Sequence, residues 1–192
     1  NANQFFVGGS LALAMTDRFS IGLTVKFFQE NLDQYQMRAL LADMGILYYV
    51  GVGDLRIGFS VRNFGGDMSP AGTPPAAPDG YVASPEFQAF PAPTGGAFGV
   101  ARTWDLSQKV TLMTTADFNH PSDYSESFRM GGELGLRRQF FLRAGYETNR
   151  AEGGLATGFG LQVERHQMRI RVDYAYSDMG SFGGVHYFSL DL

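Results

Sequence analysis

The segment 168–178, "MRIRVDYAYSD", constrains the fold of this chain more than any other stretch of its sequence. Apolar and polar side chains alternate along it: Met168, Ile170 and Val172 occupy even positions, and Arg169 and Arg171 occupy odd positions. Positions that are all even or all odd are said below to share a parity. Successive side chains of a β-strand point to opposite faces, so this pattern predicts a strand with one apolar and one charged face. A soluble sandwich would turn the charged face toward water, whereas a membrane barrel would turn it inward.

Segments of this kind, separated by turn signals, run from one end of the chain to the other. The predicted strands are 4–15, 19–30, 36–50, 55–64, 95–104, 109–119, 128–136, 140–149, 155–164, 168–177 and 185–192. Short connections such as "RRQ" (137–139) alternate with longer ones, as in a transmembrane barrel with tight periplasmic turns and longer external loops. We therefore expect an all-β protein, an antiparallel up-and-down transmembrane β-barrel that forms one domain over residues 1–192.

The short turns predict which charged residues lie opposite one another. If 137–139 closes a hairpin, Glu133 faces Arg143 and Arg129 faces Glu147. A two-residue turn at 166–167 pairs Glu164 with Arg169, and a turn at 51–54 pairs Asp43 with Arg62. Each exposed pair contributes only about 0.2–1 kcal/mol, so the pairs indicate where the charge lies more than how stable the sheet is. We interpret them as pairs that face the lumen of the barrel.

The opposite parity is apolar and favours the membrane alternative. Strands of about ten residues and aromatic residues near their ends, such as Trp104, Phe140 and Tyr174, are typical of a barrel with aromatic girdles. Arg102 is an exception, because it shares the parity of Phe98 and Val100. Either Arg102 reaches the periplasmic rim with its long side chain, or its strand contains a bulge.

Composition excludes several other classes of protein. The chain has no stretch of 18 apolar residues, no cysteine and a net charge of −4 without a basic cluster, so we expect no transmembrane helix, no disulfide and no nucleic-acid partner. Its three histidines lie far apart, and no nucleophile elbow or phosphate-binding loop is present. We expect neither a catalytic site nor a cofactor nor a metal site; the protein is not expected to be an enzyme.

Residues 65–94 contain seven of the eight prolines and are predicted to form a long extracellular loop. Because proline lowers the entropy cost of ordering a loop against a partner, this loop is the candidate contact surface for other proteins. The residues assigned to that contact are Pro70, Pro74, Pro75, Pro78, Tyr81, Phe87 and Phe90. A plain solvated loop is the alternative.

The number of predicted strands leads to an expectation about the whole barrel. Eleven strands is an odd number, whereas single-chain bacterial barrels have an even number of strands and both termini in the periplasm. An odd number of strands is therefore expected before residue 1, because an open edge in lipid would leave backbone groups unpaired.

Four stretches resemble the PorV/PorQ family of outer-membrane proteins, which have a FadL-like barrel. They are "MTDRFSIGLTVKFF" (15–28), "ADMGILYYVGVGDLRIGFSVRNFGGDM" (42–68), "ADFNHPSDYSESFRMGGELGLRRQFFLRAGYETN" (116–149) and "MRIRVDYAYSDMGSFGGVHYFSLDL" (168–192). The resemblance implies a fourteen-stranded barrel, with three strands before residue 1. It also implies a role in type IX secretion, in which such a barrel accompanies exported cargo and holds the cargo's C-terminal domain at the cell surface.

The expected function is therefore protein interaction in export or surface display. The protein would lie in the bacterial outer membrane, with long loops outside, its C-terminus in the periplasm, and lipid and secreted or envelope proteins as partners. Two alternatives remain open: a FadL-like transporter of hydrophobic small molecules, and a structural barrel of a larger envelope assembly.

Overall fold

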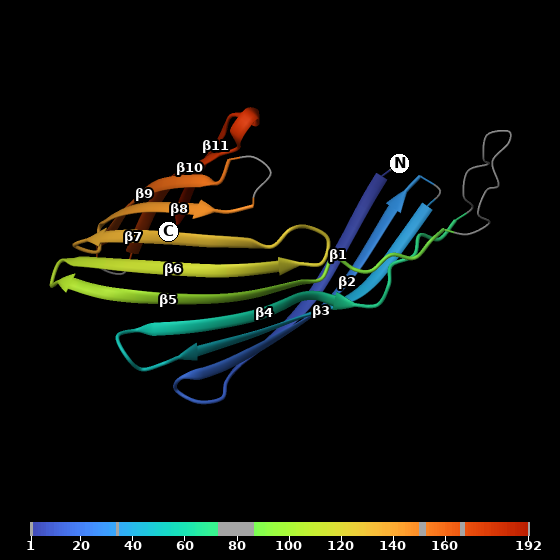
Figure 1. Ribbon diagram of the computed structural model, residues 1–192, viewed down its shortest axis with the longest axis horizontal. Coiled ribbons are helices and arrows are strands. Elements are labelled where there is room, and N and C mark those ends of the chain that lie inside the picture. The colour runs from blue at the N-terminus through green and yellow to red at the C-terminus, as the bar shows by residue number, and fades with distance from the viewer. Residues whose placement is uncertain (1, 34, 73–86, 150–152, 166–167, 192) are drawn as a thin grey trace. The chain divides into compact units, whose positions relative to one another are not determined.

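A computed structural model describes residues 2–33, 35–72, 87–149, 153–165 and 168–191 (Figure 1). Its strands are β1 (Ala2–Ala14), β2 (Phe19–Leu32), β3 (Tyr35–Tyr49), β4 (Leu55–Gly65), β5 (Gly95–Ser107), β6 (Val110–Pro121), β7 (Ser127–Leu136), β8 (Phe140–Glu147), β9 (Leu155–Arg165), β10 (Met168–Asp178) and β11 (Gly184–Asp191). One 3-10 turn, Gly180–Phe182, precedes β11. In the described part of the chain, no helix is long and apolar enough to cross a membrane.

The eleven strands form one antiparallel sheet in which each strand pairs with its neighbours in the chain. This up-and-down order confirms the all-β meander predicted from the sequence. The largest difference in a strand boundary is in β5, which extends to Ser107 instead of ending at residue 104. Asp105, Leu106 and Ser107 continue the strand, so only Gln108 and Lys109 remain to connect β5 with β6.

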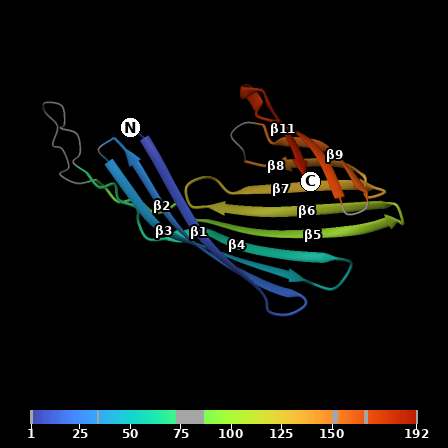
Figure 2. The same cartoon turned by 180° about the vertical axis from the view of Figure 1, so that it is seen from behind.

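The chain divides into two compact units. The first contains residues 1–46, 60–96 and 121–123, and the second contains residues 47–59, 97–120 and 124–192. The second unit contains the short connections after β5 and β7, which lie at the same end of its strands (Figures 1 and 2).

In the second unit, the observed register separates polar from apolar side chains. Glu133 lies opposite Arg143, Arg129 opposite Glu147 and Glu164 opposite Arg169, as the turns predict. Leu134 pairs with Leu142 on the other face. The charged face of β7–β10 carries Arg129, Glu133, Arg143, Glu147, Glu164, Arg169, Arg171 and Asp173. The apolar face carries Met130, Leu134, Leu142, Tyr146, Phe159, Leu161, Val163, Ile170 and Val172.

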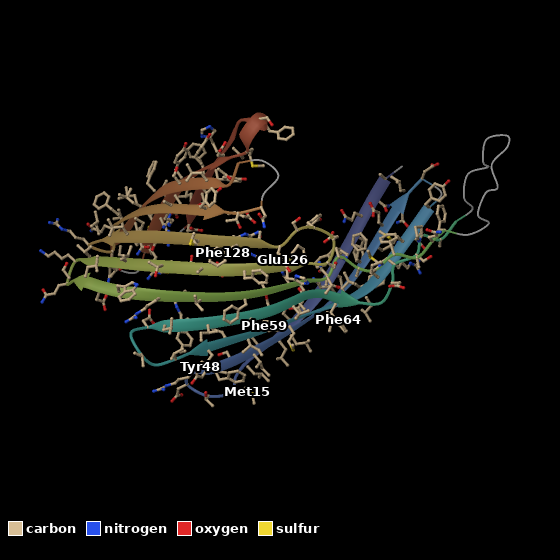
Figure 3. All side chains as sticks on the ribbon, viewed as in Figure 1. Met15, Tyr48, Phe59, Phe64, Glu126 and Phe128 are labelled. Carbon is tan, nitrogen blue, oxygen red and sulfur yellow. The ribbon has the colours of Figure 1, made fainter. Side chains whose placement is uncertain are left out.

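Around Arg143 and Asp173, burial is the reverse of that in a soluble protein. On the apolar face, Leu142 is 54% and Phe159 is 53% exposed. On the charged face, the side chain of Arg143 is 28% and that of Asp173 is 19% exposed. Figure 3 labels further large side chains that the protein leaves uncovered, among them Tyr48 and Phe59. The only buried hydrophobic side chains in the described ranges are Leu41, Met68 and Ala92, all in the first unit.

The register of β7 and β8 can be checked by disulfide trapping, because the chain has no cysteine of its own. We predict that the double variant Leu134→Cys, Leu142→Cys forms a disulfide on mild oxidation, since the two positions are directly opposed. The matched control is Leu134→Cys with Ala144→Cys, whose positions lie two residues out of register and about 7–8 Å apart. Mass spectrometry of the oxidised proteins measures the yield; equal yields for the two pairs would contradict this register.

Candidate functional site

Arg143 is the centre of a polar cluster on the charged face of the second unit. Its Nε donates a hydrogen bond to Glu133 Oε2 at 2.5 Å, and its Nη1 donates to Asp173 Oδ1 at 2.5 Å. Arg171 Nε donates to Asp173 Oδ2 at 2.7 Å. The cluster therefore joins β7, β8 and β10 through two carboxylates and two guanidinium groups, and its charges balance.

Two glycines of β9 make the contact between β8 and β10 possible. Gly158 lies opposite Arg143, and Gly160 lies opposite Asp173, so no β9 side chain separates the two charged groups. A methyl group on Gly160 would overlap Asp173 and approach both terminal nitrogens of Arg143 to 3.2 Å. The glycines thus provide the space that lets an ion pair form across an intervening strand.

The structure brings together three of the four predicted charge pairs. Besides Glu133 and Arg143, Arg129 Nε lies 2.8 Å from Glu147 Oε1, and Arg169 Nε lies 2.9 Å from Glu164 Oε1. The side chains of Arg169 and Glu164 are more than half exposed, so we assign little stability to that pair.

The fourth predicted pair, Asp43 with Arg62, does not form an ion pair among the described residues. Asp43 Oδ1 instead lies 2.5 Å from Lys26 Nζ and accepts a hydrogen bond from the backbone N–H of Asn63 at 2.8 Å. Asn63 has a φ of 55°, a left-handed conformation that distorts β4 directly after Arg62. This distortion places a backbone donor, rather than the Arg62 guanidinium, against the carboxylate.

Sequence reasoning did not pair Arg143 or Arg171 with Asp173. Two signals were present: Arg171 and Asp173 share a parity in β10, and β9 carries glycines at 158 and 160. Opposed pairs can be predicted from a hairpin turn, but the contact of Arg143 with Asp173 skips a strand.

A depression of about 620 Å³ lies beside the Arg143 cluster, within the second unit. Small residues form much of its floor, namely Gly131, Gly145, Ala156, Gly158 and Ala175. Glu133, Arg143 and Asp173 contribute its charged side. In the described part of the chain, no group of three or more acidic, histidine or cysteine side chains could hold a metal ion. Small residues and charged side chains thus lie side by side in the lining of this depression.

In the first unit, the predicted loop 65–94 is partly anchored to the sheet. We name residues 66–72 and 87–94 its two legs. The legs pair with each other through Met68 and Phe90, and Ala71 pairs with Gln36 at the start of β3. The side chains of Met68 and Ala92 are buried with Leu41 of β3, and Met37 packs against them.

The legs lie on a definite face of β3. Leu41 and Met37 share the parity of Asp43, the residue paired with Lys26, so the legs cover the same face as that ion pair. The described legs are anchored to the sheet because Met68 and Ala92 pack against Leu41 of β3. The extracellular position of the loop stays a prediction. Of the predicted contact residues, Pro70, Phe87 and Phe90 line a groove with Tyr35, and Pro74, Pro75, Pro78 and Tyr81 lie outside the described residues.

Arg102 extends to the turn end of the second unit. Its Nε donates to the carbonyl of Gly53 in the 51–54 turn at 3.2 Å, and its guanidinium lies 3.7 Å from the centroid of the Trp104 ring. The guanidinium therefore combines a cation–π contact with a hydrogen bond to a backbone carbonyl. The long side chain of Arg102 thus reaches the 51–54 turn.

Comparison with protein-family models and with curated proteins finds no match to this chain.

The Arg143 cluster generates a prediction about its supporting glycine. Replacing Gly160 with alanine should lower the free energy of unfolding by about 1–3 kcal/mol, because the added methyl group overlaps Asp173. Gly132→Ala is the matched control, since its nearest contact would be the Met113 carbonyl at an ordinary 3.7 Å. Urea titration of the refolded protein measures both. The account of the cluster fails if the two alanine variants are equally stable.

Charge exchange tests which pairs are isolated. Exchanging Glu164 and Arg169 should be tolerated, because this exposed pair has no further ion-pair partner among the described residues. Exchanging Glu133 and Arg143 should lower the free energy of unfolding by about 2 kcal/mol, because a glutamate at 143 would face Asp173. The same urea titration compares the two double variants. Equal stability would show that the ion pair between Arg143 and Asp173 does not contribute to the stability of the sheet.

Proposed function

We propose that this chain forms the wall of an outer-membrane β-barrel that interacts with other proteins through its long external connections. The apolar face of the sheet would contact lipid, and the charged face would line the inside. Long connections would face outward and short turns the periplasm. The resemblance to the PorV/PorQ family supports a closed barrel of fourteen strands with a FadL-like fold.

The inverted burial around Arg143 and Asp173 is the observation that carries this proposal. Apolar side chains such as Leu142 and Phe159 are more exposed than the charged side chains of Arg143 and Asp173. Contiguous exposed apolar surfaces of more than a few hundred Å² are rare on soluble monomers and mark contact with a partner or a membrane. A closed barrel is the one β-structure that satisfies all backbone hydrogen bonds in lipid.

The anchored legs of residues 65–94 support a role in protein contact. Their burial against Leu41 and their pairing with Gln36 hold the ends of a proline-rich segment in place. A segment with fixed ends loses less conformational entropy when it binds a partner. Following the family resemblance, we propose that the partners are exported proteins displayed at the cell surface, as in type IX secretion.

Transport of a hydrophobic small molecule is the second candidate. The depression of about 620 Å³ favours it, because a floor of glycine and alanine beside a charged cluster can accept an amphiphile.

Lipid contact predicts that a glutamate is destabilising at one position of β9 and tolerated at the adjacent position. Leu161→Glu should lower the free energy of unfolding in lipid bilayers by up to about 2 kcal/mol, because Leu161 lies on the apolar face. Gln162→Glu should be tolerated, because Gln162 lies opposite Arg171 on the charged face. Folding into liposomes, followed by the gel mobility of unboiled samples, measures both. Efficient folding of Leu161→Glu in water without lipid or detergent would contradict a membrane barrel.

The partner is tested by purification from native membranes in mild detergent, followed by mass spectrometry. Surface proteins in stoichiometric amount that share a C-terminal domain would support the export role. A lone barrel that carries a lipid would contradict it and favour transport.

A further inference from the structure

The groove beside the legs has walls suited to one kind of chemical group. It has a volume of about 290 Å³ and lies within the first unit, between the end of β2, the start of β3 and the legs. Tyr35, Phe87 and Phe90 contribute aromatic rings, and the rings of Tyr35 and Phe87 meet edge to face with centroids 5.2 Å apart. Ring faces that remain accessible attract cations through their quadrupoles.

Glu30 of β2 adds a carboxylate to these aromatic walls. The Glu30 side chain is partly buried, yet among the described residues no donor forms a hydrogen bond or an ion pair with its carboxylate. Asp43, on the neighbouring strand, has both Lys26 and a backbone N–H as partners. A partly buried carboxylate next to aromatic rings is therefore left to interact with a cation from elsewhere.

Among the described residues, no lysine or arginine pairs with Glu30. Residues 73–86, which join the two legs, contain Asp79 and Glu86 but no lysine or arginine. Charge also differs between the long connections and the strands. The long connections after β2, β4, β6 and β8 hold seven acidic residues and only Arg150 as a basic one, whereas the strands hold ten of each sign. An acidic set of long connections attracts a basic partner over a distance of about a Debye length.

We propose that this groove binds a lysine or arginine side chain of a partner protein, with Glu30 pairing with the cation and Tyr35, Phe87 and Phe90 surrounding it. This inference rests on the proposed protein-interaction function and adds the chemistry of the partner. A basic residue would gain a charge-assisted hydrogen bond and cation–π contacts in the same groove.

The test uses the full chain in detergent and a rhodamine-labelled tetra-arginine peptide, with fluorescence anisotropy as the readout. Glu30→Gln should weaken binding about tenfold, because it removes the charge but keeps the shape of the side chain. Phe90→Ala should weaken binding about threefold. Glu126→Gln is the matched control: it removes one acidic charge from another long connection, where Glu126 pairs with His120, and should change binding by less than about twofold.

Two results would overturn the proposal. Equal weakening by Glu30→Gln and Glu126→Gln would mean that the peptide responds to diffuse negative charge. Equal binding of a tetra-citrulline peptide, which has the same length without the charge, would mean that the groove does not select a cation. Membrane assembly of each variant, followed by the mobility of unboiled samples on gels, is measured separately; it tests the barrel and does not depend on the outcome at the groove.

Discussion

Backbone pairing between antiparallel strands determines every other feature of this sheet. A slip of one residue between β8 and β9 would move Arg143 away from Gly158 and exchange the charged and apolar faces. The observed register instead places Glu133, Arg143 and Asp173 on one face, where they satisfy one another's charge. The apolar side chains therefore lie on the opposite face of the sheet, where no other part of the described protein covers them. Burial of charge and exposure of hydrocarbon are thus two consequences of one register.

The cluster around Arg143 gives this register its specificity. Ion pairs that are partly buried contribute modest net stability, since desolvation offsets much of their attraction, but breaking one leaves a charge without a partner. Arg143 spans from β7 to β10 only because β9 contributes glycine at 158 and 160. The same small residues leave the depression beside the cluster, so the features that permit the ion pair also create the space that a ligand could occupy.

Local sequence signals predicted the strands and three charge pairs, because a period of two and the length of a turn are both local properties. Glu133 with Arg143 follows directly from the 137–139 turn. The partner of Asp43 did not follow, because the left-handed conformation of Asn63 has no clear signal in the sequence. The legs of 65–94 were also missed: their prolines exclude a central strand, but the packing of Met68 on Leu41 joins residues that are distant in sequence. The position of Glu30 beside Tyr35, Phe87 and Phe90, with no hydrogen-bond partner among the described residues, likewise becomes visible only once the legs are in place.

We propose that the apolar face of the sheet contacts lipid. Spin labels attached to single cysteines along β9, in protein reconstituted into liposomes, test this claim most directly. Labels at 159, 161 and 163 should collide with oxygen, which concentrates in lipid, whereas labels at 156 and 162 should collide with a water-soluble nickel complex. Alternation with this phase would place lipid against Phe159 and Leu161. Nickel access at 159, 161 and 163, or no alternation along β9, would contradict the account and place the apolar face in water or against another protein.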